Sequence, residues 1–246
     1  MNTNYSVLIV IILIITFYFL VFQYSYLNTK GIQVDGEKYQ VHRKHHNPEG
    51  AAKLLNEIVT RNKILINHLR DKYTKSNFKN AVNPDKNNRI DVIPFDKDYE
   101  IEDKVLDKIG YIDHELPYLS HRVMQLMNNY KVDRIYEISP LNPSGATSYT
   151  ENKGEKLVLC LRHKSVDAAG IHEFHDINTI MFVVIHELAH IMNNEWGHKE
   201  QYWRLFKFLI LNAVEAGVYV PVDYSKHPIT YCGMKITYNP YFDPHL

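Results

Sequence analysis

The segment His186-Glu187-Leu188-Ala189-His190 restricts the fold of this chain more than any other feature of the sequence. On a helix, two histidines four positions apart lie one above the other on one face, so both imidazoles reach the same metal ion. Glu187 is placed to take a proton from a metal-bound water rather than to bind the metal itself. This pattern indicates a hydrolytic site with Zn2+ as cofactor, His186 and His190 as metal ligands, and Glu187 as the catalytic base.

The residues before this motif, 178–185, are apolar on nearly every face of the predicted helix. A helix that is apolar all round is usually buried in a protein core. Burying two histidines and a glutamate in a core is costly unless something satisfies them, and a metal ion does so. The sequence therefore predicts a metal centre at the end of a buried helix.

A third metal ligand is predicted at His198, eight residues beyond His190. Gly197 precedes it, and glycine allows the backbone to turn sharply after the helix and bring His198 back to the metal. Three protein ligands and one water are the pattern of a catalytic zinc site, because a structural site is closed by a fourth protein ligand.

The composition excludes some classes of protein. The 246 residues carry 28 basic and 28 acidic side chains, so the net charge is zero, and we expect no nucleic-acid partner. The two cysteines, Cys160 and Cys232, do not form a disulfide framework and are interpreted as buried thiols or as thiols in a reducing compartment.

The N-terminal residues 1–28 contain no charged side chain, and residues 7–22 are almost wholly apolar. Tyrosines flank this stretch, so residues 5–26 are long enough to span a lipid bilayer as a single helix. The segment lacks the basic start and small-residue cleavage site of a signal peptide, which predicts a retained transmembrane anchor. Basic residues follow the span and none precedes it, so the C-terminal domain is predicted on the cytoplasmic side.

The rest of the chain divides into three parts. Residues 29–47 are polar and rich in His and Lys, and they are interpreted as a tether. Residues 48–130 form a helical part, with a long amphipathic helix to about Tyr73, a polar loop over 74–98, and helical patterns near 101–109 and 119–130. Residues 131–246 form the metal-binding domain, with strands over 134–138, 147–150, 157–161 and 235–238 and a second apolar helix over 201–216. The predicted fold class is α+β, a small sheet packed on helices behind the N-terminal transmembrane helix.

Several of these features together resemble the WLM and SprT-like zincin metallopeptidases. The resemblance rests on the strand at 157–162, the hydrophobic helix with His-Glu-Leu-Ala-His, the Gly-His pair with an aromatic residue shortly after it, and Tyr231-Cys232-Gly233-Met234. It covers roughly residues 130–240 and is greatest to WLM-like proteins of large DNA viruses. It implies a zincin-like fold, His186, His190 and His198 as zinc ligands, and Glu187 as general base.

The spacing departs from this family in one place. WLM proteins usually have five residues between the second and third histidines, whereas seven intervene here. Glu195 in that loop and Glu215 on the next helix are therefore alternative third ligands to His198. His172-Glu173-Phe174-His175 is interpreted as a non-helical segment with a surface or capping role, with His175 or Asp176 as a possible partner of the metal ligands.

The function predicted from these features is a membrane-anchored zinc metallopeptidase that acts on a protein or peptide substrate. In this hypothesis the strand at 157–161 is the edge strand that binds the substrate backbone, and Tyr231 is one candidate to stabilise the oxyanion. The first alternative is a non-catalytic zinc-binding structural protein of a membrane, such as a virion membrane. The second, repair of DNA–protein crosslinks, is disfavoured by the neutral charge and the anchor.

Overall fold

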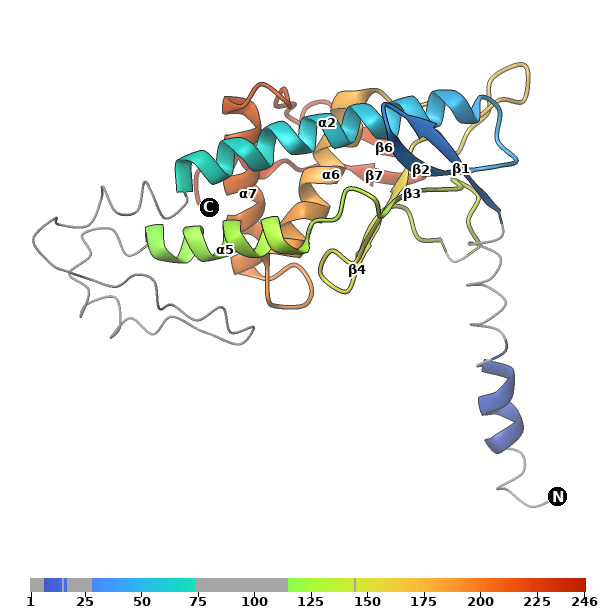
Figure 1. Cartoon of the computed structure of the whole chain (residues 1–246), viewed down its shortest axis with the longest axis horizontal. Helices are drawn as coiled ribbons and strands as arrows, with labels where there is room; N and C mark the ends of the chain where they lie inside the picture. The colour runs from blue at the N-terminus through green and yellow to red at the C-terminus, as the bar shows by residue number, and fades with distance from the viewer. Residues whose placement is uncertain (1–6, 15, 17–27, 74–114, 144) are drawn as a thin grey trace, which may run out of the picture.

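The computed structural model describes residues 7–14, 16, 28–73, 115–143 and 145–246. A five-stranded sheet in the order β1-β2-β3-β5-β4 forms one part of the fold, and a two-stranded sheet of β6 and β7 lies near the C-terminus. In the larger sheet, β2, β3 and β5 run parallel, and β1 and β4 are antiparallel to their neighbours at the two edges. The expected combination of a small sheet with packed helices is therefore confirmed (Figure 1).

Residues 29–47, interpreted from the sequence as a tether, instead contain two strands of the sheet. Strands β1 (Thr29–Val34) and β2 (Glu37–His42) form a hairpin closed by Asp35 and Gly36, both with positive φ. Asp-Gly is a preferred sequence for such a two-residue turn, so the signal was present in the chain. The tether interpretation was wrong because it weighted the polar composition over this turn and over the alternating side chains of β2, whose Tyr39 and Val41 are buried.

Helix α2 (Pro48–Tyr73) matches the predicted long amphipathic helix. Its apolar face packs against β1, β2 and β3, and it also contacts α5, α6 and α7 (Figure 1). Helix α5 (Glu115–Asn129) overlaps the helical pattern expected at 119–130. The loop predicted over 74–98 and the helical pattern predicted at 101–109 lie outside the described residues.

Helix α6 (Ile177–Met192) occupies the centre of the core, as its apolar sequence predicts. The Asp176 carboxylate begins it by accepting the Thr179 backbone N–H at 2.9 Å, which satisfies one of the free donors at the helix N-terminus. Helix α7 (Glu200–Glu215) follows after a short loop and packs on α6. The metal motif is therefore held by an element that the core surrounds on almost every side.

Strands β3 (Ile135–Ile138), β4 (Tyr149–Glu151) and β5 (Lys156–Cys160) form the other half of the sheet. The sequence interpretation took the strand at 157–161 as the edge strand, and the structure corrects this. Strand β5 is buried between β3 and β4, and the edge beside α6 belongs to β4. A continuous apolar run such as β5 is typical of an interior strand, whereas β4 is short and half-buried, as an edge permits.

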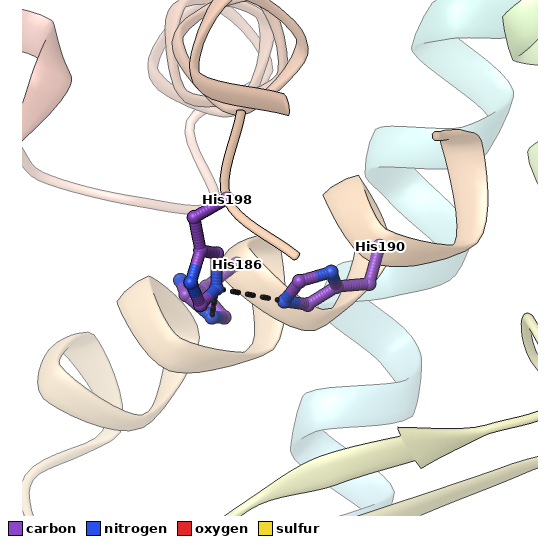
Figure 2. A group of neighbouring side chains, drawn as sticks. All are labelled: His186, His190 and His198. Carbon is purple, nitrogen blue, oxygen red and sulfur yellow. Dashed lines mark hydrogen bonds between the residues drawn. The ribbon is translucent and has the colours of Figure 1, made fainter. Parts of the chain in front are cut away.

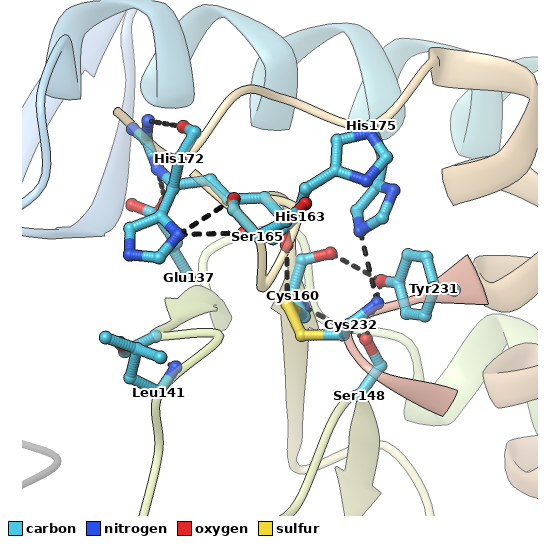
Figure 3. Close-up of a disulfide and its surroundings, with 12 residues drawn as sticks. Glu137, Leu141, Ser148, Cys160, His163, Ser165, His172, His175, Tyr231 and Cys232 are labelled. Carbon is cyan, nitrogen blue, oxygen red and sulfur yellow. Dashed lines mark hydrogen bonds and ion pairs between the residues drawn. A yellow bond between two sulfur atoms is a disulfide. The ribbon is translucent and has the colours of Figure 1, made fainter. Parts of the chain in front are cut away.

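Cys160 and Cys232 form a disulfide, which contradicts their interpretation as free thiols (Figure 3). The bond joins the end of β5 to the turn of the hairpin made by β6 (Ile229–Tyr231) and β7 (Met234–Ile236). The Tyr231 hydroxyl beside it donates to the Cys160 carbonyl oxygen at 2.5 Å and lies 2.8 Å from Ser148 Oγ. The two cysteines are 72 positions apart, so only the folded chain reveals that they pair.

Glu137 on β3 and Arg162 just beyond β5 form a buried ion pair, with Nε and Oε1 2.7 Å apart and both side chains at most 2% exposed. Arg162 also donates to the backbone carbonyls of Asn47 and His172 at 3.3 Å. One guanidinium thus connects the sheet to the start of α2 and to the loop before α6. Such a pair is costly to break, because removing one partner leaves an uncompensated charge in the core.

The predicted transmembrane anchor falls largely on residues outside the description. Of residues 5–26, the structure describes 7–14 and 16, which are helical. Within the described part of the chain, no helix has both the length and the apolar character needed to cross a bilayer.

Replacing both Cys160 and Cys232 with serine is expected to lower the free energy of unfolding by about 2–4 kcal/mol, because the disulfide closes a long loop and restricts the unfolded chain. Denaturant unfolding measures this difference. Treating the wild-type protein with a reductant should reproduce the loss, and the same treatment should leave the variant unchanged. Equal stabilities of oxidised wild type and variant would contradict the expectation.

Candidate metal centre

Three histidine side chains meet at the C-terminal half of α6. His186 and His190 extend from the helix, and His198 reaches them from the loop before α7 (Figure 2). His198 Nε2 lies 3.0 Å from His190 Nε2 and 3.2 Å from His186 Nε2. One ligand nitrogen from each of the three histidines lies within 4.8 Å of the other two. Among the His, Cys, Asp and Glu side chains in the described part of the chain, this is the group that could hold a metal ion.

The geometry of this cluster fits a tetrahedral metal ion. With Zn–N bonds of about 2.0–2.1 Å, two ligand nitrogens of a tetrahedral zinc lie about 3.3–3.4 Å apart, close to the separations found here. A ring nitrogen carries either one proton or one lone pair, so His198 Nε2 cannot make a full hydrogen bond to both neighbours. One cation accepts all three lone pairs at once, so the donor set suits zinc.

The environment keeps these imidazoles in their uncharged form, which is the form that binds metal. Burial, aided by the charges of the neighbouring histidines, lowers the pKa of His186 to about 3. Burial likewise lowers the pKa of His190 to about 4, with smaller effects from His198 and Lys153. Burial also lowers the pKa of His198.

Glu187 follows His186 directly on α6, and the residue is 5% exposed. Burial raises the pKa of Glu187 to about 8, and the backbone N–H of Thr150, which donates to the carboxylate, opposes that rise. Thr150 belongs to β4, so the edge strand and the carboxylate are in direct contact. A carboxyl group whose pKa lies near neutrality is suited to accept and release a proton during a reaction.

Tyr202 on α7 supports the histidines, whereas the sequence analysis noted an aromatic residue after the Gly-His pair without giving it a role. Its buried ring stacks on His190 with ring centres 4.4 Å apart, and it lies 4.6 Å from the His198 ring. Its hydroxyl donates to the His186 backbone carbonyl at 3.3 Å. The available signal was an aromatic residue four positions after His198, which brings the ring onto the first turn of the next helix.

Gly197 has a φ of +81°, in the left-handed region that favours glycine, and this turn directs His198 toward α6. The seven residues between His190 and His198 therefore leave His198 in contact with the histidines of the helix. The alternative ligands lie elsewhere: Glu215 pairs with Lys72 at 2.5 Å, and Glu195 pairs with Lys199 at 3.5 Å. The structure brings His186, His190 and His198 together and leaves both glutamates outside the cluster.

The remaining candidates have structural contacts. Asp176 caps α6, and His175 Nε2 accepts the Cys232 backbone N–H at 3.2 Å, in a segment that is not helical. The Tyr231 hydroxyl, considered for the oxyanion, is fully buried and engaged by Cys160 and Ser148. These side chains organise the start of α6 and the end of β5.

A comparison with protein-family models matches the WLM domain over residues 112–235, about half of the chain. The chain belongs to the WLM domain family. This is a family of the zinc metallopeptidase type, and the match covers α5, the sheet from β3 onward and the metal-binding helix. Membership confirms the resemblance that the motifs indicated.

Relatives of this WLM protein occur in viruses. An uncharacterized protein of Acanthamoeba polyphaga mimivirus is 33% identical over 136 residues, which cover 55% of this chain and 64% of the relative. An uncharacterized protein of Invertebrate iridescent virus 6 is 29% identical over 97 residues, or 39% of this chain and 50% of the relative. The chain therefore spans less than two thirds of either relative.

Among solved structures, Wss1 from Saccharomyces cerevisiae matches with 24% identity and a TM-score of 0.30, over 42% of this chain and 76% of that chain.

Replacing His198 with alanine should weaken zinc binding at this cluster, because a direct ligand is removed. The loss should exceed the factor of about 10 to 100 that is typical when a residue hydrogen-bonded to a metal ligand is removed. Glu215→Ala and Glu195→Ala are the matched controls and should retain the metal. Titration with zinc in a competing chelator measures all three. Loss of zinc from Glu215→Ala with retention in His198→Ala would assign the third ligand to the glutamate.

Proposed function

We propose that this WLM protein is a zinc-dependent metallopeptidase that hydrolyses peptide bonds with Glu187 as the general base. The observation that carries this proposal is a buried glutamate that adjoins His186 on α6, together with the three converging imidazoles. Zinc bound there would lower the pKa of a water molecule toward neutrality and polarise the scissile carbonyl. His186, His190 and His198 would hold the metal, and family membership supports the same assignment.

Glu187 would accept the proton of the attacking water and pass it to the leaving amine. Its burial is important for this role, because the surroundings that raise its pKa also keep bulk water away from the carboxyl group. A purely structural zinc protein has no use for such a group beside the metal. This carboxylate therefore favours hydrolysis over the non-catalytic alternative.

Strand β4 would bind the substrate. It is the edge of the sheet next to α6, and Thr150 in it contacts Glu187. An extended peptide can add to such an edge through backbone hydrogen bonds, which would set the scissile bond beside the metal whatever the side chains of the peptide. The substrate class would then be an extended or unfolded polypeptide segment.

Glu187→Gln is expected to keep zinc and the fold but to lower peptide hydrolysis by about 100- to 10,000-fold, the usual contribution of general acid–base catalysis. The amide has nearly the shape of the carboxylate but cannot accept the proton. Cleavage of a broad library of unfolded peptides, read by mass spectrometry, measures the effect.

Glu195→Gln is the control in that experiment, because Glu195 is a neighbouring acid in an exposed loop. It should cleave like the wild type. Equal rates for wild type and Glu187→Gln would exclude Glu187 as the base. If no form cleaves any peptide while zinc is bound, the non-catalytic structural protein becomes the correct reading.

The proposal includes attachment to a membrane through residues 5–26. The uncharged, apolar sequence over 7–22 and the flanking tyrosines support it. The basic residues after the span favour a cytoplasmic position of the domain, whereas the Cys160–Cys232 disulfide favours an oxidising setting, such as a virion surface. Digestion by a protease added outside sealed membranes distinguishes these two positions.

The apolar segment should remain in the mature protein. Intact-mass measurement of protein extracted from its native membrane is expected to give a chain that still contains residues 7–22, because the segment lacks a cleavage site of the signal-peptide type. A mature N-terminus beyond residue 24 would identify the segment as a signal peptide and remove the anchor from the proposal.

A further inference from the structure

A second group of histidines lines a pocket that shares no residue with the candidate metal centre. The pocket has a volume of about 470 Å³, and its walls include His42, His45, His46 and His172. It lies where the parallel strands β2 and β3 end, at His42 and at residues 137–139. In open sheets with parallel strands, ligands commonly bind outside the carboxyl ends of the strands.

Three of the four rings lie in contact. The ring centres of His42 and His45 are 4.3 Å apart, and those of His45 and His172 are 5.4 Å apart. These spacings bracket the 4.8–5.0 Å between the rings of the cluster around His198. The ligand atoms of the pocket histidines have not converged, so joint binding requires the three side chains to move toward one another.

The hydrogen bonds of His172 fix which of its nitrogens is available. Its Nδ1 lies 3.0 Å from the backbone carbonyl oxygen of His163 and 3.3 Å from that of Ser165 (Figure 3). Carbonyl oxygens only accept, so Nδ1 carries the proton and Nε2 of the neutral ring keeps a lone pair. Donation of one ring N–H to a backbone carbonyl is also the usual state of a metal-binding histidine.

The other two rings complete the set. His45 Nε2 lies 2.9 Å from Ser139 Oγ, which orients this ring and leaves Nδ1 as its second nitrogen. His42 is 8% exposed, and its buried Nδ1 has no hydrogen-bond partner. A buried ring nitrogen without a partner is costly, and a ligand in the pocket would remove that cost.

Two of these rings are uncharged near neutral pH, which is the form that binds metal. Burial, with help from nearby positive charges, lowers the pKa values of His42 and His45 to about 4, so near neutral pH both rings offer lone pairs rather than positive charge. Two positive side chains lie near these rings: Arg162, which is paired with Glu137, and Lys44, which lines the pocket. Neutral imidazoles are preferred ligands of zinc, copper and nickel ions.

We propose that this pocket is a second metal site, which binds an imidazole-preferring transition-metal cation through His42, His45 and His172. It goes beyond the proposed peptidase function, because it uses other residues and other strands. Its location at the ends of β2 and β3 assigns a role to the histidines of residues 29–47 that the metallopeptidase chemistry does not use.

Zinc content of the full-length chain tests the proposal. The protein is stripped with a chelator, dialysed against zinc and analysed by elemental mass spectrometry. The wild type should bind two zinc ions per chain, and the double variant His45→Ala/His172→Ala should bind one. His227→Ala is the matched control, because His227 is an exposed histidine outside both sites, and it should bind two.

A second double variant separates this proposal from the peptidase. His186→Ala/His190→Ala should lose the zinc of the candidate metal centre and keep the zinc of the pocket. One zinc ion in the wild type, retained by His45→Ala/His172→Ala, would overturn the second site and leave the peptidase intact. One zinc ion that only the pocket variant loses would instead overturn the peptidase.

Ser139→Ala tests the pocket without removing a ligand. The hydroxyl also accepts the Leu141 backbone N–H at 3.2 Å, so circular dichroism is used to verify that the variant keeps its fold. Because the hydroxyl orients His45, zinc affinity at the pocket should fall by about 10- to 100-fold, as for other partners of metal ligands. An unchanged affinity for the second zinc would show that His45 does not bind it.

Discussion

The structure depends on how the core accommodates two imidazoles and a carboxyl group on its central helix. Helix α6 is surrounded by apolar side chains, yet it carries the buried Glu187 and the half-buried His186 and His190. Buried polar groups of this kind destabilise a protein unless they are paired. In this fold, His198 and Tyr202 from the next segment contact His190, and the edge strand contacts Glu187.

The positions of these partners are consequences of packing around α6. Helix α7 lies against α6, which brings the ring of Tyr202 onto His190. The loop between the two helices returns His198 to α6 through the left-handed turn at Gly197. The ligand geometry thus depends on one backbone conformation and one helix contact.

The other end of the sheet is organised by charge. The buried pair of Glu137 and Arg162 joins β3 and β5 to the start of α2, and Glu137 also accepts the His42 backbone N–H at 2.8 Å. This pair holds the ends of the parallel strands beside the histidine-lined pocket. The metal centre is therefore supported by the apolar side chains around α6, and the pocket by the buried ion pair next to His42.

The sequence alone determined the elements whose signals are local. The period of the apolar residues identified α2, α6 and α7, and the four-residue spacing of His186 and His190 identified the shared face, because both depend only on the geometry of one helix. The Asp35-Gly36 turn of the first hairpin was equally local, and its signal was outweighed by polar composition. Tertiary structure decided what depends on distant segments.

Three features needed that tertiary information. The order of strands made β4 the edge in place of β5, because β3 pairs with β5 after a long crossover. Cys160 met Cys232 across 72 positions, and His198 rather than Glu215 met α6. In each case the partners lie on separate segments, and only the packing of one segment against another determined which of them met.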